Sequence, residues 1–181
     1  MAVAKNQVTL VLGPANSGKS EWAEKLAKQS NHPVTYVATA IADPNDPGWQ
    51  KKLQKHASRR PTSWQTQEIP TALAEFIAQG TAQDCLLIDS LGTWVANLLV
   101  ETEAEWEVTL THFLDTLQQT SSQVILVGEE TGWGVIPAYK SGRVFRDRLG
   151  NLTRQIGENA AEVYLITGGY ALPLKAIGYP L

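Results

Sequence analysis

The chain has 181 residues, of which 43% are hydrophobic and 18% charged, a composition typical of a globular protein and not of a disordered one. This length favours one domain, spanning residues 1–181. With 15 basic and 18 acidic residues, the formal net charge of −3 argues against a broad basic surface for nucleic acid or an anionic membrane. The single cysteine, Cys85, excludes an intramolecular disulfide, and no apolar run approaches the ~20 residues of a membrane span. We therefore expect a cytoplasmic protein with no membrane span and no nucleic-acid partner.

Short apolar runs alternate with helical patterns along the chain. The runs predict buried strands at residues 8–12, 34–38, 85–88, 124–127 and 163–167. Helices are expected between them, at residues 21–29, 71–79, 103–119 and 146–161. In the third helix, apolar side chains recur on one face, as Trp106, Leu110, Phe113 and Leu117. Strands that are apolar on both faces and alternate with helices predict an α/β fold, with a mainly parallel central sheet flanked by helices.

Two polar stretches, at residues 43–60 and 129–143, interrupt this alternation. Both contain several prolines or glycines. Each begins near the carboxyl end of a predicted strand, where ligands bind in open α/β sheets. We therefore expect both to be active-site loops and not linkers between domains.

The strongest motif follows the first predicted strand and fits the pattern G-x-x-x-x-G-K-[ST] of a phosphate-binding loop. The residues of this loop are Gly13, Pro14, Ala15, Asn16, Ser17, Gly18, Lys19 and Ser20. Glycines let the backbone curl so that successive N–H groups point at phosphate oxygens. Lys19 adds a cation for the β- and γ-phosphates, the Ser20 hydroxyl is placed for Mg²⁺, and the following helix adds its positive end. The sequence therefore predicts a site for a nucleoside triphosphate.

Asp89 follows the apolar residues 86–88 at the end of a predicted strand. A charged group at the end of a buried strand costs free energy unless it has a partner. A carboxylate that organises the metal beside a phosphate loop would explain it. The alternative is an aspartate that caps the next helix.

Among the three histidines, His56 has the neighbourhood best suited to chemistry, because Arg59 and Arg60 follow it. A neutral imidazole is a good nucleophile toward phosphorus, and nearby cations stabilise the phosphates under attack. From spacing alone, a solvated surface histidine is the better interpretation. No second histidine or cysteine stands at ligand spacing, so a transition-metal site is not expected.

Several segments, taken in order, make the chain resemble a known family. They are residues 13–24, residues 36–40, the group His56, Arg60, Pro61, Trp64, Thr66 and Glu68, and residues 89–99, 130–137 and 143–154. The chain resembles the bifunctional adenosylcobinamide kinase / adenosylcobinamide-phosphate guanylyltransferase family of cobalamin biosynthesis. The phosphate loop alone is generic, but the combination in this order is specific and covers nearly the whole chain.

The resemblance implies two reactions. A nucleoside triphosphate first phosphorylates the aminopropanol hydroxyl of adenosylcobinamide. GTP then guanylylates a histidine, pyrophosphate leaves, and the GMP passes to the cobinamide phosphate. His56 matches the guanylylated histidine of the family, and Asp89 matches its acidic residue at a strand end. Lys19 and Ser20 match its phosphate and metal residues.

The resemblance also implies a RecA-like P-loop fold and a set of ligands. The ligands are GTP and ATP as substrates, Mg²⁺ as cofactor, and adenosylcobinamide and its phosphate as acceptors. Arg60 and Glu68 are further nucleotide-binding residues on this basis, and a homo-oligomer, commonly a trimer, is suggested. Within the loop, Pro14 stands where the family usually has glycine, and Asn16 where it usually has arginine.

Two other functions compete with this one. The first is a plain small-molecule kinase or nucleotide hydrolase in which His56 has no role, and the second is a regulatory nucleotide-binding module without turnover. The stretch from His56 to Glu68 favours the bifunctional transferase, because a plain kinase does not need it.

Overall fold

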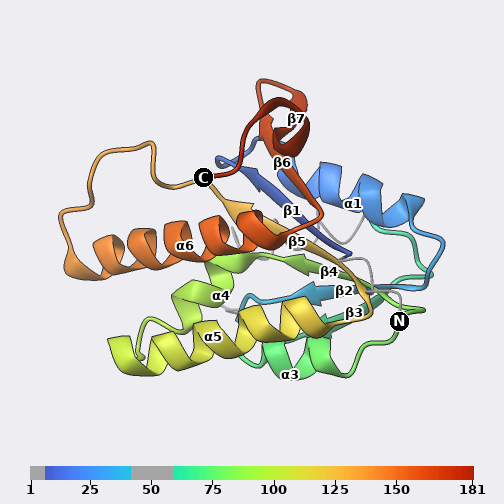
Figure 1. Cartoon of the computed structure of the whole chain (residues 1–181), viewed down its shortest axis with the longest axis horizontal. Coiled ribbons are helices and arrows are strands. Elements are labelled where there is room, and N and C mark those ends of the chain that lie inside the picture. The colour runs from blue at the N-terminus through green and yellow to red at the C-terminus, as the bar shows by residue number, and fades with distance from the viewer. Residues whose placement is uncertain (1–6, 42–58) are drawn as a thin grey trace.

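The computed structural model describes residues 7–41 and 59–181, and within these ranges seven strands form one sheet (Figure 1). The strands are β1 Val8–Gly13, β2 Val34–Ala38, β3 Gln65–Glu68, β4 Cys85–Asp89, β5 Gln123–Glu129, β6 Glu162–Thr167 and β7 Tyr170–Pro173. Their order is β3-β2-β4-β5-β1-β6-β7, and each neighbouring pair is parallel except β6 with β7. This arrangement confirms the expected α/β fold with a mainly parallel sheet.

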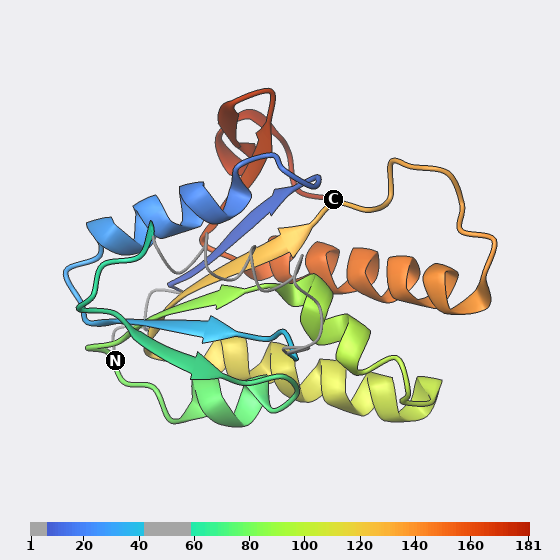
Figure 2. The ribbon, with the colours of Figure 1, turned by 180° about the vertical axis from the view of Figure 1, so that it is seen from behind.

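Helices cover both faces of the sheet (Figures 1 and 2). They are α1 Lys19–Gln29, α3 Leu73–Ala78, α4 Leu91–Asn97, α5 Glu103–Gln119, α6 Lys140–Asn159 and α7 Leu174–Ile177. Helix α1 covers one face, here called the α1 face, and α3 to α6 cover the other, the α3–α6 face. Alternate residues of β4 point to opposite faces of the sheet. Leu86 and Ile88 pack on the α3–α6 face, whereas Cys85 and Leu87 pack on the α1 face.

All five predicted strands form, with bounds that agree within a residue or two. The two strands that were not predicted lie at the edges of the sheet. Strand β3 has the polar sequence Gln-Thr-Gln-Glu and all four residues are exposed, so it carries no apolar signal. Strand β7 folds back on β6 through Gly168 and Gly169, whose φ angles of 57° and 82° suit glycine.

The predicted helices also form. Helix α5 has the predicted bounds, and its four apolar side chains on one face are buried. Helix α6 begins at Lys140, earlier than predicted, so the glycine-containing stretch 129–143 is a loop only in its first part. Helices α4 and α7 were not predicted. In the part of the chain that the structure describes, no helix has both the length and the apolar character that crossing a membrane demands.

The register of the sheet aligns several strand ends in one row. Ala38 of β2 pairs with both Glu68 of β3 and Asp89 of β4, and Asp89 is aligned through β5 with Val11 of β1. Paired residues of a parallel sheet point to the same face, and Val11 packs on the α1 face. The phosphate loop, residues 13–20, begins two positions beyond Val11. The carboxylates of Glu68 and Asp89 and the phosphate loop therefore lie at the same end of the sheet, where the parallel strands have their carboxyl ends.

Candidate active site

The loop between β1 and α1 has the tight backbone that its glycines predict. A Cβ atom on Gly13 would lie 2.5 Å from Oγ of Ser17 and 2.7 Å from the carbonyl oxygen of Ile166, so only glycine fits there without a shift. Asn16 and Gly18 have φ angles of 58° and 91°, in the left-handed region that these two residue types tolerate best. Such turns allow consecutive N–H groups to converge on an anion.

Side chains of the loop also suit an anionic ligand. Nζ of Lys19 donates a hydrogen bond across the loop to the carbonyl oxygen of Pro14, at 3.4 Å. Oγ of Ser17 is buried and has no hydrogen-bond partner among the described residues. Helix α1, with 11 residues, directs its positive end at the same place. A lysine, an unpaired buried hydroxyl and a helix N-terminus together fit the oxygens of nucleotide phosphates.

Asp89 is half-buried at the end of β4 and is held there by Tyr36. The Tyr36 hydroxyl donates a hydrogen bond to the Asp89 carboxylate. Burial and the charge of Asp89 both raise the pKa of Tyr36 above its ordinary value, so Tyr36 remains a donor at neutral pH. The peptide bond between Asp89 and Ser90 is cis.

The helix after Asp89 is capped by other residues. Ser90 is the N-cap residue of α4, and it forms a capping box with Thr93. The N–H of Gly92 donates to Oε2 of Glu129, at the end of β5, at 2.8 Å. The alternative in which Asp89 caps this helix is therefore wrong.

Arg60 and Glu68 lie toward the β3 edge of the sheet. The guanidinium carbon of Arg60 is 3.7 Å from the ring centroid of Tyr36, and its Nη1 is 3.4 Å from Oγ1 of Thr66. Arg60, Tyr36 and Asp89 thus form one connected group. Glu68 is exposed, two strands from Asp89, which corresponds to about 10 Å at the usual strand spacing.

His56 lies outside the described residues. Tyr36 and Glu24, which connect elements of the site, were not predicted as site residues, and Arg59 was predicted only as a cation near His56. Glu24 is only 3% exposed on α1, and its Oε1 is 3.0 Å from Nη2 of Arg59. Nothing local in the sequence identified Arg59 as the partner of Glu24.

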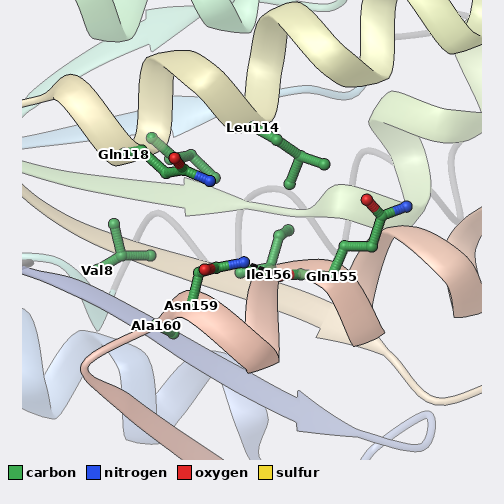
Figure 3. A pocket seen from close by; sticks show the side chains of 8 residues that line it. Val8, Leu114, Gln118, Gln155, Ile156, Asn159 and Ala160 are labelled. Carbon is green, nitrogen blue, oxygen red and sulfur yellow. Dashed lines mark hydrogen bonds between the residues drawn. The ribbon is translucent and has the colours of Figure 1, made fainter.

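A small pocket lies at the opposite end of β1, between α5 and α6 (Figure 3). It encloses about 10 Å³, close to the space that one water molecule needs. Its lining residues are Val8, Leu114, Leu117, Gln118, Gln155, Ile156, Asn159 and Ala160. Val8 is the first residue of β1 and Gly13 the last, so this pocket is separate from the candidate active site.

Comparison of the sequence with known proteins identifies a family. The family model described as cobinamide kinase / cobinamide phosphate guanyltransferase matches residues 9–174. The bifunctional adenosylcobalamin biosynthesis protein CobP of Pseudomonas aeruginosa is 38% identical over 178 residues, which cover 95% of this chain and 98% of CobP. The bifunctional adenosylcobalamin biosynthesis protein CobU of Escherichia coli is 30% identical over 181 residues, which cover 92% and 98% of the two chains.

Solved structures with low sequence identity share the fold. A protein from Pyrococcus horikoshii OT3 matches with a TM-score of 0.57 at 10% identity, over 95% of this chain and 87% of its own. A prototypical ATPase from the type III secretion system of pathogenic bacteria matches with a TM-score of 0.58 at 11% identity, over 90% and 52% of the two chains. These likenesses agree with a P-loop NTPase fold. On the family match and the curated relatives, this chain belongs to the cobinamide kinase / cobinamide phosphate guanyltransferase family.

Proposed function

We propose that this chain is a bifunctional enzyme of cobalamin biosynthesis, with one catalytic domain spanning residues 1–181. It phosphorylates adenosylcobinamide with a nucleoside triphosphate, and it transfers GMP from GTP to adenosylcobinamide phosphate. The observation that carries this proposal is the family match over residues 9–174, from β1 to the start of α7. The curated relatives are named as bifunctional proteins, which disfavours a plain kinase, a hydrolase or a regulatory module.

In the kinase step, the phosphate loop holds the donor nucleotide through residues 13–20. Lys19 offsets the negative charge that is spread over the transferred phosphoryl group. Ser20 and Asp89 are the residues suited to hold Mg²⁺, which would neutralise charge on the β- and γ-phosphates. The hydroxyl oxygen of adenosylcobinamide attacks the γ-phosphorus, and its proton passes to solvent. The bond between the γ-phosphorus and the oxygen that bridges to the β-phosphate breaks, and the nucleoside diphosphate leaves with that oxygen.

In the guanylyltransferase step, His56 is the proposed nucleophile. The attack requires a neutral imidazole, and the reference pKa of histidine, about 6.5, makes that form accessible near pH 7. A ring nitrogen attacks the α-phosphorus of GTP, a P–N bond forms, the bond to the β-phosphate oxygen breaks, and pyrophosphate leaves. A phosphate oxygen of the phosphorylated cobinamide then attacks the same phosphorus and displaces the imidazole. The support is the match of His56 to the histidine of the family, with Arg59 and Arg60 three and four residues after it.

Arg60 and Glu68 contact the nucleotide in this proposal. The support is their match to the family, together with the position of Arg60 over Tyr36, whose hydroxyl donates to Asp89. The chain assembles as a homo-oligomer, with the trimer that the family resemblance suggests. A cytoplasmic location fits an enzyme that uses GTP and ATP as substrates.

The test follows both products in one assay with adenosylcobinamide, ATP, GTP and Mg²⁺. Wild-type protein should form the phosphate and then the guanylylated corrinoid. His56→Asn should stop at the phosphate, because direct phosphoryl transfer needs no nucleophile from the enzyme. His112→Asn, at an exposed position of α5, is the control and should form both products. Guanylylated product from His56→Asn, or no phosphate from the wild type, would contradict the proposal.

A further inference from the structure

Arg59 is held by three residues of α1 at the point where the described chain resumes. Its Nη1 lies 3.0 Å from Oε1 of Glu21, and its Nη2 lies 3.0 Å from Oε1 of Glu24. Nζ of Lys28 donates to the backbone carbonyl oxygen of Arg59 at 3.4 Å. One face of one helix therefore contacts both the side chain and the backbone of Arg59.

Burial makes the contact with Glu24 different from a surface ion pair. The side chain of Glu24 is 4% exposed, whereas that of Glu21 is 63% exposed. A carboxylate kept away from water depends on its cation, because loss of the partner leaves a buried charge uncompensated. The pair of Arg154 with Glu158 on α6 is exposed, so water solvates either charge when the other is removed. Such surface pairs contribute little to the free energy of folding. The contact of Arg59 with Glu24 is therefore the part of this arrangement that fixes a position.

The helix that holds Arg59 is the helix of the phosphate site. Lys19 and Ser20 form the first turn of α1 with Glu21, and Glu24 lies one turn further on. The adjacent Arg60 stacks on Tyr36 of β2. The two arginines thus attach the chain to the phosphate-loop helix on one side and to the sheet on the other.

We propose that Arg59 is a positioning residue for guanylyl transfer. Through Glu24, it anchors the chain at residue 59, three residues after His56, to the helix of the phosphate loop. The inference rests on the proposed function, because it takes His56 as the nucleophile. A nucleophile displaced by about 1 Å can lose on the order of 10²-fold in rate, whereas phosphoryl transfer to adenosylcobinamide does not use His56.

The double variant Arg59→Ala/Glu24→Gln tests this, because it removes the cation and leaves no buried charge behind. At saturating α-labelled GTP, the initial rate of GMP incorporation at His56 should fall about tenfold or more, by the sensitivity of attack to position. The kinase rate and the KM for GTP should stay within about twofold. Arg59→Lys should recover part of the incorporation rate, since it keeps a cation beside Glu24. Glu21→Gln and Arg154→Ala are exposed controls and should lose little of either activity.

Two results would overturn the role of Arg59. One is a double variant that incorporates GMP at the wild-type rate. The other is an equal fall in kinase and incorporation rates, which would mean that the contact holds the phosphate site and not the histidine. Wild-type protein without label at His56 would overturn the proposed function itself, so the two failures are distinguishable.

Discussion

The two faces of the sheet differ in what their buried charges contact. On the α3–α6 face, Trp94 packs against Trp106 and Phe113 at centroid distances of 5.9 and 4.6 Å, and the buried Arg148 donates to the carbonyl oxygens of Leu98 and Glu101. On the α1 face, the apolar cluster is smaller, and next to it lie charged groups such as Glu24 and Asp89. Burying charge costs free energy. The charges of the α1 face lie on the phosphate-loop helix and at a strand end, so we assign the chemistry to this face and most of the stability to the larger apolar cluster of the other.

This division predicts that the two faces respond differently to substitution. Changes on the α1 face should alter activity more than stability, and changes on the α3–α6 face should do the reverse.

Lys19→Ala should abolish both activities while the protein stays folded. A lost charge-assisted contact costs about 1.5–3 kcal/mol of binding, and more where charge develops in the transition state. Kinase and guanylyltransferase rates, measured with thermal unfolding on the same samples, check this. Lys25→Ala, an exposed lysine on the same helix, is the control. Normal turnover by Lys19→Ala would remove the phosphate loop from the mechanism.

Phe113→Ala should lower the free energy of unfolding by about 3–5 kcal/mol, because it opens a cavity beside the buried ring of Trp94. Activity per folded molecule should not change, since Phe113 lies on the face opposite the site. Denaturant unfolding and rates corrected for the folded fraction provide the measurement. Val108→Ala, 71% exposed on the same helix, should shift stability by less than about 0.5 kcal/mol. Loss of activity in folded Phe113→Ala would show that the faces are coupled.

Asp89→Asn should keep the fold and weaken the dependence of turnover on Mg²⁺. Asparagine has nearly the same size, so packing survives, but the carboxylate charge is lost. Titrating turnover against Mg²⁺ should show a higher half-saturating concentration than for the wild type. Identical Mg²⁺ curves would exclude Asp89 as a metal residue.

Thr102→Ala should cost about 1 kcal/mol of stability at neutral pH, because it removes the N-cap of α5. Hydrogen bonds from the backbone and side chain of Thr102 lower the pKa of Glu105 below its ordinary value of 4.5. The stability from Glu105 is therefore present above that value and is lost as the pH falls through its folded pKa. In denaturant unfolding, the difference in stability between wild type and variant should shrink as the pH falls from neutral to well below 4.5. Both proteins should have the same activity.

The sequence predicted those parts of the site that are contiguous in the chain. The phosphate loop is one run of eight residues between a strand and a helix, so the motif and its context identify it together. Asp89 was predicted because it ends an apolar run. Strand β3 was missed because its residues Gln65–Glu68 are polar, and it forms by pairing with β2 at an edge.

Contacts between distant segments could not be predicted in this way. Arg59 and Glu24 are 35 residues apart, and neither residue type specifies the other as its partner. The hydrogen bond from Tyr36 to Asp89 joins β2 to β4, and it depends on a register that the pattern of apolar residues does not give. Both contacts depend on how strands and helices pack against one another, so local patterns in the sequence do not reveal them.

The central claim is that His56 carries GMP as a phosphoramidate. Wild-type protein and His56→Asn are incubated with α-labelled GTP, denatured, digested, and the labelled peptide is sequenced. The account predicts label on the wild-type peptide that contains His56, lost in acid and stable in base, and none on His56→Asn. Label on another residue, or unlabelled wild-type protein under conditions where guanylyl transfer proceeds, would contradict it.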